Sequence, residues 1–196
     1  DCGAALAAIH GLDVSALPAL PARPADVGLR LLRDTHRRYR ADVPVFELAL
    51  QWLEDHLPPP REPRLVHGDF RTGNLMVGPD GLRAVLDWEM AHLGDPLEDL
   101  GWLCSPAWRF GSPLPVAGVG ERDDLLRAYA SVTGVVVDPD DLIWWEVSAI
   151  LRWGVICIGQ ADAHRSGATR SHELAAIGRR VCETEHDLFV VLQGRW

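Results

Sequence analysis

The sequence contains no lysine: all nineteen residues of the Lys and Arg class are arginine. It also lacks a glycine-rich phosphate loop, because its single Gly-x-Gly, Gly118-Val119-Gly120, has Asp123 where a third glycine would fall. A nucleotide site that relies on a lysine beneath a glycine-rich loop cannot be built from these residues alone. We interpret the Gly-x-Gly as a flexible linker.

Cysteine is scarce and scattered. The four cysteines, at positions 2, 104, 157 and 182, form no Cys-x-x-Cys pair, which favours reduced, buried thiols in a cytoplasmic protein. No basic region followed by an apolar one occurs near the N-terminus, so no secretory signal is visible. The chain starts at Asp1 rather than Met, which suggests trimming or fragmentation.

Positive charge is also in deficit. Twenty-eight acidic residues against nineteen basic ones give a formal net charge of −9, which argues against a nucleic-acid groove.

The 196 positions are 47% hydrophobic and include eight tryptophans, which is enough to form the core of one domain or of part of a larger one. Four arginines, at positions 30, 33, 37 and 38, lie on the polar side of a predicted helix. We interpret this group as a solvated helix face, and a site for an anionic substrate or coenzyme tail is the less favoured alternative.

The most informative feature is a polar loop between apolar segments. The loop His67–Asn74 follows Leu65-Val66 and precedes the apolar run Leu75–Val77. Turn chemistry at Pro79-Asp80-Gly81 then predicts a strand that returns toward Asp87. The resulting hairpin would hold the loop at one end and bring Asp87 back to the same end.

Three oxygen-bearing residues in this region have an informative spacing. Asn74 follows Asp69 by five positions, and Asp87 follows it by eighteen. Phosphoryl transfer needs hard oxygen ligands for magnesium and a carboxylate that accepts the proton of the attacking hydroxyl. The catalytic loop of protein kinases supplies a base Asp, a magnesium Asn and a later magnesium Asp in this order.

Two motifs carry a family resemblance. The segments His67-Gly68-Asp69-Phe70-Arg71-Thr72-Gly73-Asn74 and Leu86-Asp87-Trp88-Glu89-Met90-Ala91-His92-Leu93-Gly94-Asp95-Pro96 resemble the aminoglycoside phosphotransferase and choline-kinase branch of kinase-like folds. Within that branch they are most similar to the broad phosphotransferase enzyme family. Gly68 stands where a protein kinase has Arg, and Asp87-Trp88-Glu89 stands for Asp-Phe-Gly. The end of the first helix, Ile9-His10-Gly11, also resembles the family.

The resemblance implies a role for each site residue. Asp69 would be the catalytic base, His67 would brace the catalytic loop, and Asn74 and Asp87 would bind Mg²⁺ and, through it, ATP. Taken singly, Asp69 also fits a turn cap, Asn74 an Asx turn and His67 a satisfied core histidine. Arg71 either faces a phosphate or acidic substrate group or is a solvated loop arginine.

The resemblance also implies a fold. We expect a predominantly helical α+β structure, the C-terminal lobe of a protein-kinase-like fold over residues 1–196. A small β-hairpin at about residues 64–88 would carry the catalytic loop. The N-terminal nucleotide-binding lobe, with its lysine and glycine-rich loop, is absent from this chain and is expected in the full-length protein.

Apolar periodicity predicts six helices. They are Ala4–His10, Asp26–Tyr39, Val45–Leu57, Leu125–Thr133, Leu142 to about His164, and Ser171–Val191. The fifth is apolar almost all round, but Glu146 and Arg152 inside it favour a core helix over a membrane span. These two residues are six apart and would not pair with each other. Each of them either faces the surface, which we favour, or contacts substrate.

A further helix is predicted from capping residues at Asp95-Pro96-Leu97-Glu98. Asp95 is therefore better explained as a cap than as a metal ligand. Asp99 has two interpretations. It either ties the helix to the backbone of the catalytic loop, as the resemblance implies, or it is exposed to solvent.

Three functional hypotheses follow. The leading one is an ATP- and magnesium-dependent phosphotransferase acting on the hydroxyl of a small molecule, without nucleic-acid or membrane partners. The second is a catalytically silent lobe that binds a small molecule or partner. The third is a metal-dependent phosphohydrolase that uses His67, Asp69, Asp87, His92 and Asp95. The resemblance does not identify the acceptor, because family members act on aminoglycosides, choline, homoserine-like compounds, sugars and hydroxyacyl groups.

Overall fold

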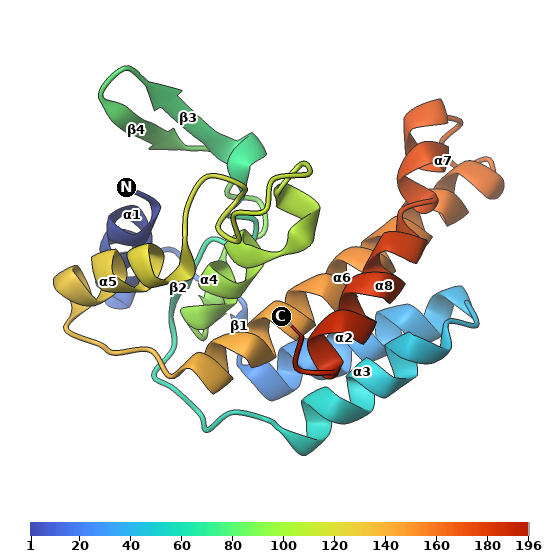
Figure 1. The fold of residues 1–196 in the computed structure, drawn as a ribbon, viewed down its shortest axis with the longest axis horizontal. Coiled ribbons are helices and arrows are strands. Elements are labelled where there is room, and N and C mark those ends of the chain that lie inside the picture. Colours follow the sequence, from blue (N-terminus) through green and yellow to red (C-terminus); the bar gives the residue numbers. More distant parts are fainter. Residues whose placement is uncertain (196) are drawn as a thin grey trace. The chain divides into compact units, whose positions relative to one another are not determined.

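The structure is a computed structural model that describes residues 1–195. It divides into two compact units. The first comprises Asp1–Ala25 and Pro58–Glu146, and the second comprises Asp26–Leu57 and the residues from Val147 onward. Helices predominate and the strands are short (Figure 1), so the predicted class, α+β with a majority of helix, is confirmed.

The first unit contains a sheet of three short strands. β5 (His92–Gly94) lies in the middle, parallel to β1 (Ala22–Arg23) and antiparallel to β2 (Arg64–Val66). The apolar residues of β2 are buried, which fixes its register against β5. β2 therefore delivers the chain into the loop 67–74 from a rigid support.

A separate two-stranded hairpin follows that loop. β3 (Leu75–Gly78) and β4 (Gly81–Val85) pair antiparallel, as the turn chemistry predicts, and the first residue of β3 lies opposite the last residue of β4. The hairpin thus occupies the later part of the predicted region, whereas β2 belongs to the other sheet. Because of this register, Asn74 and Leu86 flank the open end of the hairpin.

Three α-helices lie wholly within the first unit. α1 (Cys2–His10) packs along α5 (Arg122–Thr133), and Gly3 permits the close approach, since a Cβ there would lie 2.5 Å from the Leu125 carbonyl oxygen. α4 (Leu97–Cys104) is buried along almost its whole length. Short 3-10 turns complete the unit at Val14–Ala16, Thr72–Asn74 and Pro106–Trp108.

The Gly-x-Gly forms a packed turn rather than an open linker. Val116 bridges to Gly120, and the side chain of Val116 is buried together with Ala117. Gly118 has φ +76° and lies against the Arg109 carbonyl, where a Cβ would approach to 2.6 Å. The glycine therefore serves local geometry, a role that composition alone does not distinguish from a linker.

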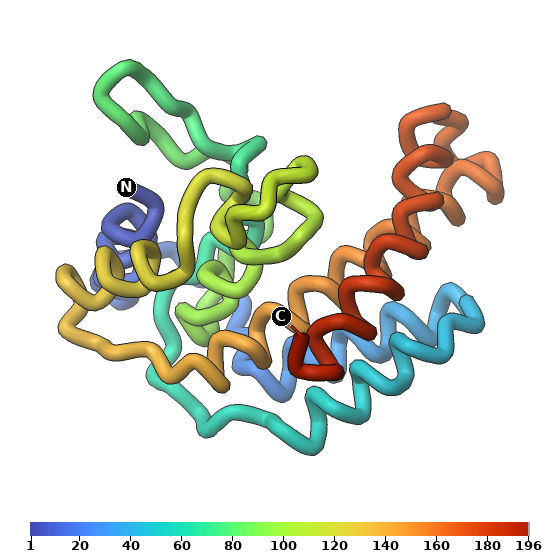
Figure 2. The backbone as a smooth tube through the Cα atoms, viewed as in Figure 1, coloured from blue at the N-terminus to red at the C-terminus, as the bar shows by residue number. Residues whose placement is uncertain are grey.

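The second unit is a group of helices. α2 (Ala25–Tyr39) and α3 (Pro44–Asp55) run side by side as an antiparallel pair (Figure 2). An ion pair between Arg33 and Glu54 connects them, and His36 Nε2 lies 3.3 Å from Glu47 Oε1. The predicted helices Asp26–Tyr39 and Val45–Leu57 are thus confirmed to within two residues. The arginine group of α2 is mostly exposed or ion-paired, as the solvated-face interpretation expects.

The long apolar helix is α6 (Pro139–Arg165), which begins in the first unit and continues into the second. By length and composition it is able to cross a membrane, yet 61% of its most apolar window is buried inside the structure, as the core-helix prediction expects. The prediction that Glu146 faces the surface is wrong. Glu146 is wholly buried and accepts hydrogen bonds of 2.6 Å from both Nε and Nη2 of Arg122, a pairing with another helix that helical spacing does not reveal.

The C-terminal segment departs from the prediction of one helix over Ser171–Val191. It forms two helices, α7 (His172–Gly178) and α8 (Val181–Leu192). Ser171 caps α7 by accepting a hydrogen bond from the backbone N–H of Leu174. Gly178 lies against Ala161 of α6 with no room for a Cβ, so close packing at that point breaks a pattern that is locally continuous.

Candidate active site

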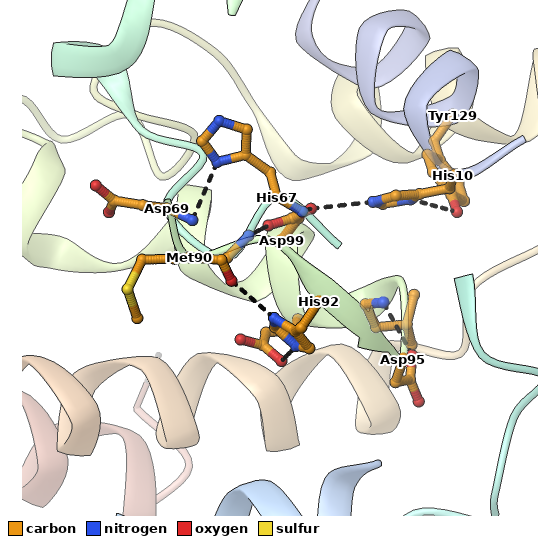
Figure 3. A network of polar contacts seen from close by, with 11 residues as sticks. His10, His67, Asp69, Met90, His92, Asp95, Asp99 and Tyr129 are labelled. Carbon is orange, nitrogen blue, oxygen red and sulfur yellow. Dashed lines mark hydrogen bonds and ion pairs between the residues drawn. The ribbon is translucent and has the colours of Figure 1, made fainter. Parts of the chain in front are cut away.

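The loop 67–74 is held from below by one buried carboxylate. Asp99, in the first turn of α4, accepts the backbone N–H of His67 at 2.8 Å on Oδ2 and that of Gly68 at 2.9 Å on Oδ1 (Figure 3). Gly68 has φ +79°, and a Cβ there would lie 2.7 Å from the Met90 carbonyl oxygen. Asp99 therefore ties helix to loop, and the solvent-exposed alternative is wrong.

Asp99 is itself held by residues distant in the sequence. His10 Nε2 lies 3.1 Å from Asp99 Oδ2, and His10 Nδ1 lies 3.0 Å from the Tyr129 hydroxyl. Burial raises the pKa of Asp99, but the hydrogen bond and charge of His10 together with the two backbone N–H groups outweigh it, so the pKa lies below its usual value. Burial raises the pKa of Tyr129 to about 12, which keeps its hydroxyl proton available for a hydrogen bond.

His67 braces the loop with both of its ring nitrogens. The backbone N–H of Asp69 donates to His67 Nδ1 at 3.1 Å, so Nε2 carries the hydrogen and donates it to the Leu86 carbonyl oxygen at 3.0 Å. The ring is wholly buried, and the Trp88 ring packs against it with a centroid distance of 4.5 Å. His67 thus connects the start of the loop to the end of β4.

The carboxylate of Asp69 points away from Asp99 and remains partly accessible, with 19% of its side chain exposed (Figure 3). Three side chains donate to it. Trp102 Nε1 donates to Oδ1 at 2.9 Å, Asn74 Nδ2 to Oδ2 at 2.7 Å, and Arg71 Nε shares its hydrogen between the two oxygens at 3.2 and 3.1 Å. The carboxylate is therefore oriented on both sides and still reachable from solvent.

Asn74 is oriented by two hydrogen bonds from the same nitrogen. Its Nδ2 donates to the backbone carbonyl of Asp69 at 2.9 Å as well as to the carboxylate, so the amide oxygen points elsewhere. The Leu86 N–H donates to the Asn74 carbonyl at 2.8 Å, which brings the next residue, Asp87, to the same end of the hairpin. Asp87 is exposed and has φ +66°, an uncommon backbone conformation outside glycine that is found at functional sites.

These donors fit a magnesium ion. The amide oxygen of Asn74 accepts no hydrogen bond from any residue in the range 1–195, and the exposed Asp87 carboxylate offers further hard oxygens. Among the described residues, no group of three His, Cys, Asp or Glu side chains has the geometry of a metal site. A small oxygen-ligand set that also uses the nucleotide phosphates suits this arrangement better than a transition-metal centre does.

The phosphohydrolase hypothesis also requires His92 and Asp95 as metal ligands, but both side chains already have other partners. His92 Nδ1 faces the Met90 carbonyl at 3.0 Å, and its Nε2 faces Glu98 at 3.1 Å. Asp95 accepts from the Leu97 N–H at 2.9 Å and pairs with Arg61 at 3.0 Å. The predicted N-cap is therefore one residue early, because α4 begins at Leu97 and its N-cap is Pro96, while Asp95 precedes the cap and still accepts a backbone N–H of the first turn.

Sequence reasoning missed two features of this site. Trp102 gave no signal beyond being an apolar residue of a helix, because its N–H meets Asp69 across 33 positions. The sequence places Arg71 in solvent or against an anionic ligand, whereas in the structure it pairs with Asp69 and lies over the Trp108 ring at 5.0 Å. Long-range pairings of this kind leave no periodic trace in a single sequence.

Comparison with known protein families places the chain in a family. The model of the phosphotransferase enzyme family matches residues 1–135. Acyl-CoA dehydrogenase family member 11 of Gallus gallus is 36% identical over 160 residues, which cover 72% of this chain and 20% of that protein. The Homo sapiens member 11 is 31% identical over 147 residues, which cover 66% and 19%. The chain thus spans about a fifth of the length of these curated relatives.

Solved structures share the fold. A Ralstonia eutropha protein assigned as an aminoglycoside phosphotransferase superposes with a TM-score of 0.82 at 22% identity, covering 98% of this chain and 64% of that one. A choline/ethanolamine kinase family protein from Mesorhizobium loti gives 0.66 at 15% identity over 97% and 59%. A spectinomycin phosphotransferase in complex with ADP and spectinomycin gives 0.63 at 15% identity over 98% and 64%.

Proposed function

Because the chain belongs to the phosphotransferase enzyme family, we propose that it is the catalytic and acceptor-binding lobe of an ATP-dependent phosphotransferase that acts on a small-molecule hydroxyl. One observation carries this proposal. Asp69 and Asn74 are hydrogen-bonded to each other, and the register of the β3–β4 hairpin brings Asp87 to the same end. This grouping of one carboxylate, one amide and the start of the segment that carries a second carboxylate supports the assignment of a base and two oxygen ligands.

Asp69 is the proposed catalytic base. The acceptor oxygen forms a bond to the γ-phosphorus of ATP, the bond between that phosphorus and the β–γ bridging oxygen breaks, and ADP leaves. The hydroxyl proton passes to the Asp69 carboxylate. Accessibility of the carboxylate supports this role, since a base must reach within hydrogen-bond distance of its proton.

Asn74 and Asp87 are the proposed ligands for Mg²⁺, which when bound neutralises charge on the nucleotide phosphates. The amide orientation of Asn74 supports this assignment, since its nitrogen is occupied by Asp69 and its oxygen is not. His67 is a positioning residue in this proposal, because its two hydrogen bonds join the base-bearing loop to the strand that ends before Asp87.

The nucleotide also needs contacts that these 196 residues lack. We propose that an N-terminal lobe encoded beside this region supplies the lysine and the glycine-rich loop that hold the phosphates in kinase-like enzymes. The presence of ADP in the related spectinomycin phosphotransferase supports a nucleotide as the phosphate donor. The alternative is a silent lobe that binds a small molecule or partner, and the missing lysine favours it for the 196-residue chain in isolation.

The proposed acceptor is a small hydroxylated molecule. A screening panel should contain an aminoglycoside, spectinomycin and choline, because solved structures of this fold are assigned to those substrate classes. It should also contain a hydroxyacyl-CoA, because the curated relatives are named as members of an acyl-CoA dehydrogenase family. Thermal stabilisation in the presence of Mg²⁺ and a non-hydrolysable ATP analogue would rank the acceptors before turnover is measured.

The deciding experiment compares Asp69→Asn with Asp80→Asn in the full-length protein. Both substitutions remove one carboxylate charge, but Asp80 is in the β3–β4 turn, 78% exposed and paired with Arg83. We expect Asp69→Asn to lower phosphate transfer by at least about 100-fold and Asp80→Asn to leave it within about threefold. Transfer by Asp69→Asn within threefold of the parent would show that another group accepts the proton.

The same assay, applied to the 196-residue chain and to the full-length protein, distinguishes the silent-lobe alternative from the proposed phosphotransferase. We expect the 196-residue chain alone to show no ATP-dependent transfer, and the full-length protein to show transfer that Asp87→Ala abolishes. If the full-length protein binds a panel compound but transfers nothing, the alternative is correct. If the isolated chain transfers phosphate and Asp87→Ala abolishes it, the proposed need for an N-terminal lobe is wrong.

A further inference from the structure

The indole of Trp102 makes a direct contact with the proposed base. Its Nε1–H donates to Asp69 Oδ1 at 2.9 Å, from α4 to the loop 67–74, across 33 positions of sequence. We propose that Trp102 is a positioning residue that fixes the orientation of the Asp69 carboxylate. This inference rests on the proposed function, because it assigns Trp102 a role in the same transfer reaction.

The geometry explains why this donor matters. Asn74 holds Oδ2 at 2.7 Å and Trp102 holds Oδ1 at 2.9 Å, so one firm hydrogen bond acts on each carboxylate oxygen. The third donor, Arg71 Nε, is shared between both oxygens at longer distances and sets no rotation by itself. Without the indole, only Asn74 and the shared Arg71 hydrogen bond act on the carboxylate, and its rotation is no longer fixed from the Oδ1 side.

A second tryptophan keeps this arrangement in place. The Trp108 ring packs against the Trp102 ring at a centroid distance of 5.2 Å and an interplanar angle of 57°. Arg71 lies over the same Trp108 ring at 5.0 Å. Both tryptophans are almost wholly buried, so the indole that donates to Asp69 cannot rotate without opening the core. The two rings, Arg71 and Asp69 therefore form one closed set of contacts.

The competing explanation is that Trp102 only fills the core. Trp145 provides the matched control, because it is buried in the same unit but its indole nitrogen has no hydrogen-bond partner within the described residues. A Trp→Phe substitution removes similar volume at both positions. Only at position 102 does it also remove a hydrogen bond to Asp69.

The first test is spectroscopic and needs no turnover. In the full-length protein labelled with ¹⁵N, the indole resonance of Trp102 is identified by its loss in Trp102→Phe. We expect this resonance to move when Asp69 is replaced by Asn, while the resonance of Trp145, identified in the same way, stays in place. An unchanged Trp102 resonance in Asp69→Asn would overturn the contact and the inference with it.

The second test is kinetic. We expect Trp102→Phe to lower kcat by about 10- to 100-fold with little change in KM, because displacement of a reacting group by up to about 1 Å has effects of this order. Trp145→Phe should leave kcat within about threefold. In the Asp69→Asn background, Trp102→Phe should have no further effect, since there is no carboxylate left to orient.

The outcomes separate the two proposals. If the wild-type protein turns over and Trp102→Phe matches Trp145→Phe in kcat, the inference is wrong and the proposed function is unaffected. The same holds if Trp102→Phe lowers the residual activity of Asp69→Asn as strongly as that of the wild type. If the Trp102 resonance responds to Asp69→Asn but the wild type transfers phosphate to no panel compound, the proposed function and the catalytic role of the contact both fail.

Discussion

The imidazole of His10 lies 3.1 Å from the carboxylate of Asp99, although the two residues are 89 positions apart. Both side chains are buried. Through this contact α1 supports the carboxylate that holds the loop 67–74, and Tyr129 supports His10 in turn. The stability of the first unit and the geometry of the candidate site therefore depend on the same hydrogen-bonded chain.

Removal of His10 should destabilise the protein strongly. His10→Ala leaves a buried carboxylate without its side-chain partner, and we expect it to lower the free energy of unfolding by about 3–5 kcal/mol. Tyr129→Phe removes only the outer hydroxyl of the chain and should cost about 0.5–1.5 kcal/mol. Chemical denaturation measures both. His56→Ala, at an exposed position, should cost less than about 1 kcal/mol, and a similar loss at positions 10 and 56 would contradict the buried pairing.

A methyl group at Gly68 should distort the loop. Gly68→Ala combines a positive φ with a Cβ placed 2.7 Å from the Met90 carbonyl oxygen, and we expect a loss of about 2–4 kcal/mol. Gly111→Ala is the matched control, because Gly111 has φ +85° with no atom within 4 Å of its added Cβ. Its cost should be about 1–2 kcal/mol, from backbone strain alone. If thermal or chemical unfolding gives the same loss of stability for both substitutions, the backbone near Met90 shifts to make room for the added methyl group.

Glycine at position 87 should separate stability from function. Asp87 has φ +66°, so Asp87→Gly relieves backbone strain and should change the free energy of unfolding by no more than about 1 kcal/mol, toward greater stability. The same substitution removes a proposed magnesium ligand and should abolish phosphate transfer. Arg40→Gly, at an exposed residue with φ +50°, offers similar relief and should leave transfer intact. Full transfer by Asp87→Gly would exclude Asp87 from the metal site.

His92 should make stability fall as the pH rises. Burial of the ring lowers the pKa of His92, but the hydrogen bond and charge of Glu98 outweigh it, so the pKa lies above the usual 6.5. Both ring nitrogens face oxygen acceptors, and only the protonated ring donates to both. The stabilisation is fully present below pH 6.5 and is lost as the pH rises through the higher folded-state pKa.

The measurement is the free energy of unfolding between pH 5.5 and pH 9, which extends about 1 unit below and about 2.5 units above the unfolded-state pKa of about 6.5. We expect the difference between the wild type and His92→Gln to shrink as the pH rises. In a Glu98→Gln background, the stability difference caused by His92→Gln should depend less on pH, because Glu98 is the source of the raised pKa of His92. A difference that is constant across this range would show that His92 keeps one protonation state.

The candidate site was largely predictable because its spacing is local. Asp69, Asn74 and Asp87 lie within one loop and one hairpin, and turn residues at positions 79–81 are enough to bring the two ends together. Helix existence was predictable for the same reason, since periodicity and capping act within a few residues. The split between α7 and α8 was not, because close packing of Gly178 against Ala161 overrides a continuous local pattern.

The partners of the charged and aromatic residues required the folded chain. Nothing in the spacing of Asp99, Trp102 or Glu146 indicates that they meet His10, Asp69 and Arg122. These contacts form between elements that no short-range rule brings together, and each is selected by the fit of buried surfaces and by the need of buried polar groups for a partner.

The amino-acid sequence by itself determined most of the helices, the hairpin and the order of the three polar residues, because those depend on interactions between near neighbours in the chain. Only the tertiary structure decided which distant side chains hold the loop from beneath and which indole faces its carboxylate. Hydrogen bonds in a water-excluded interior are settled by three-dimensional packing, and a linear pattern of residue types does not contain that information.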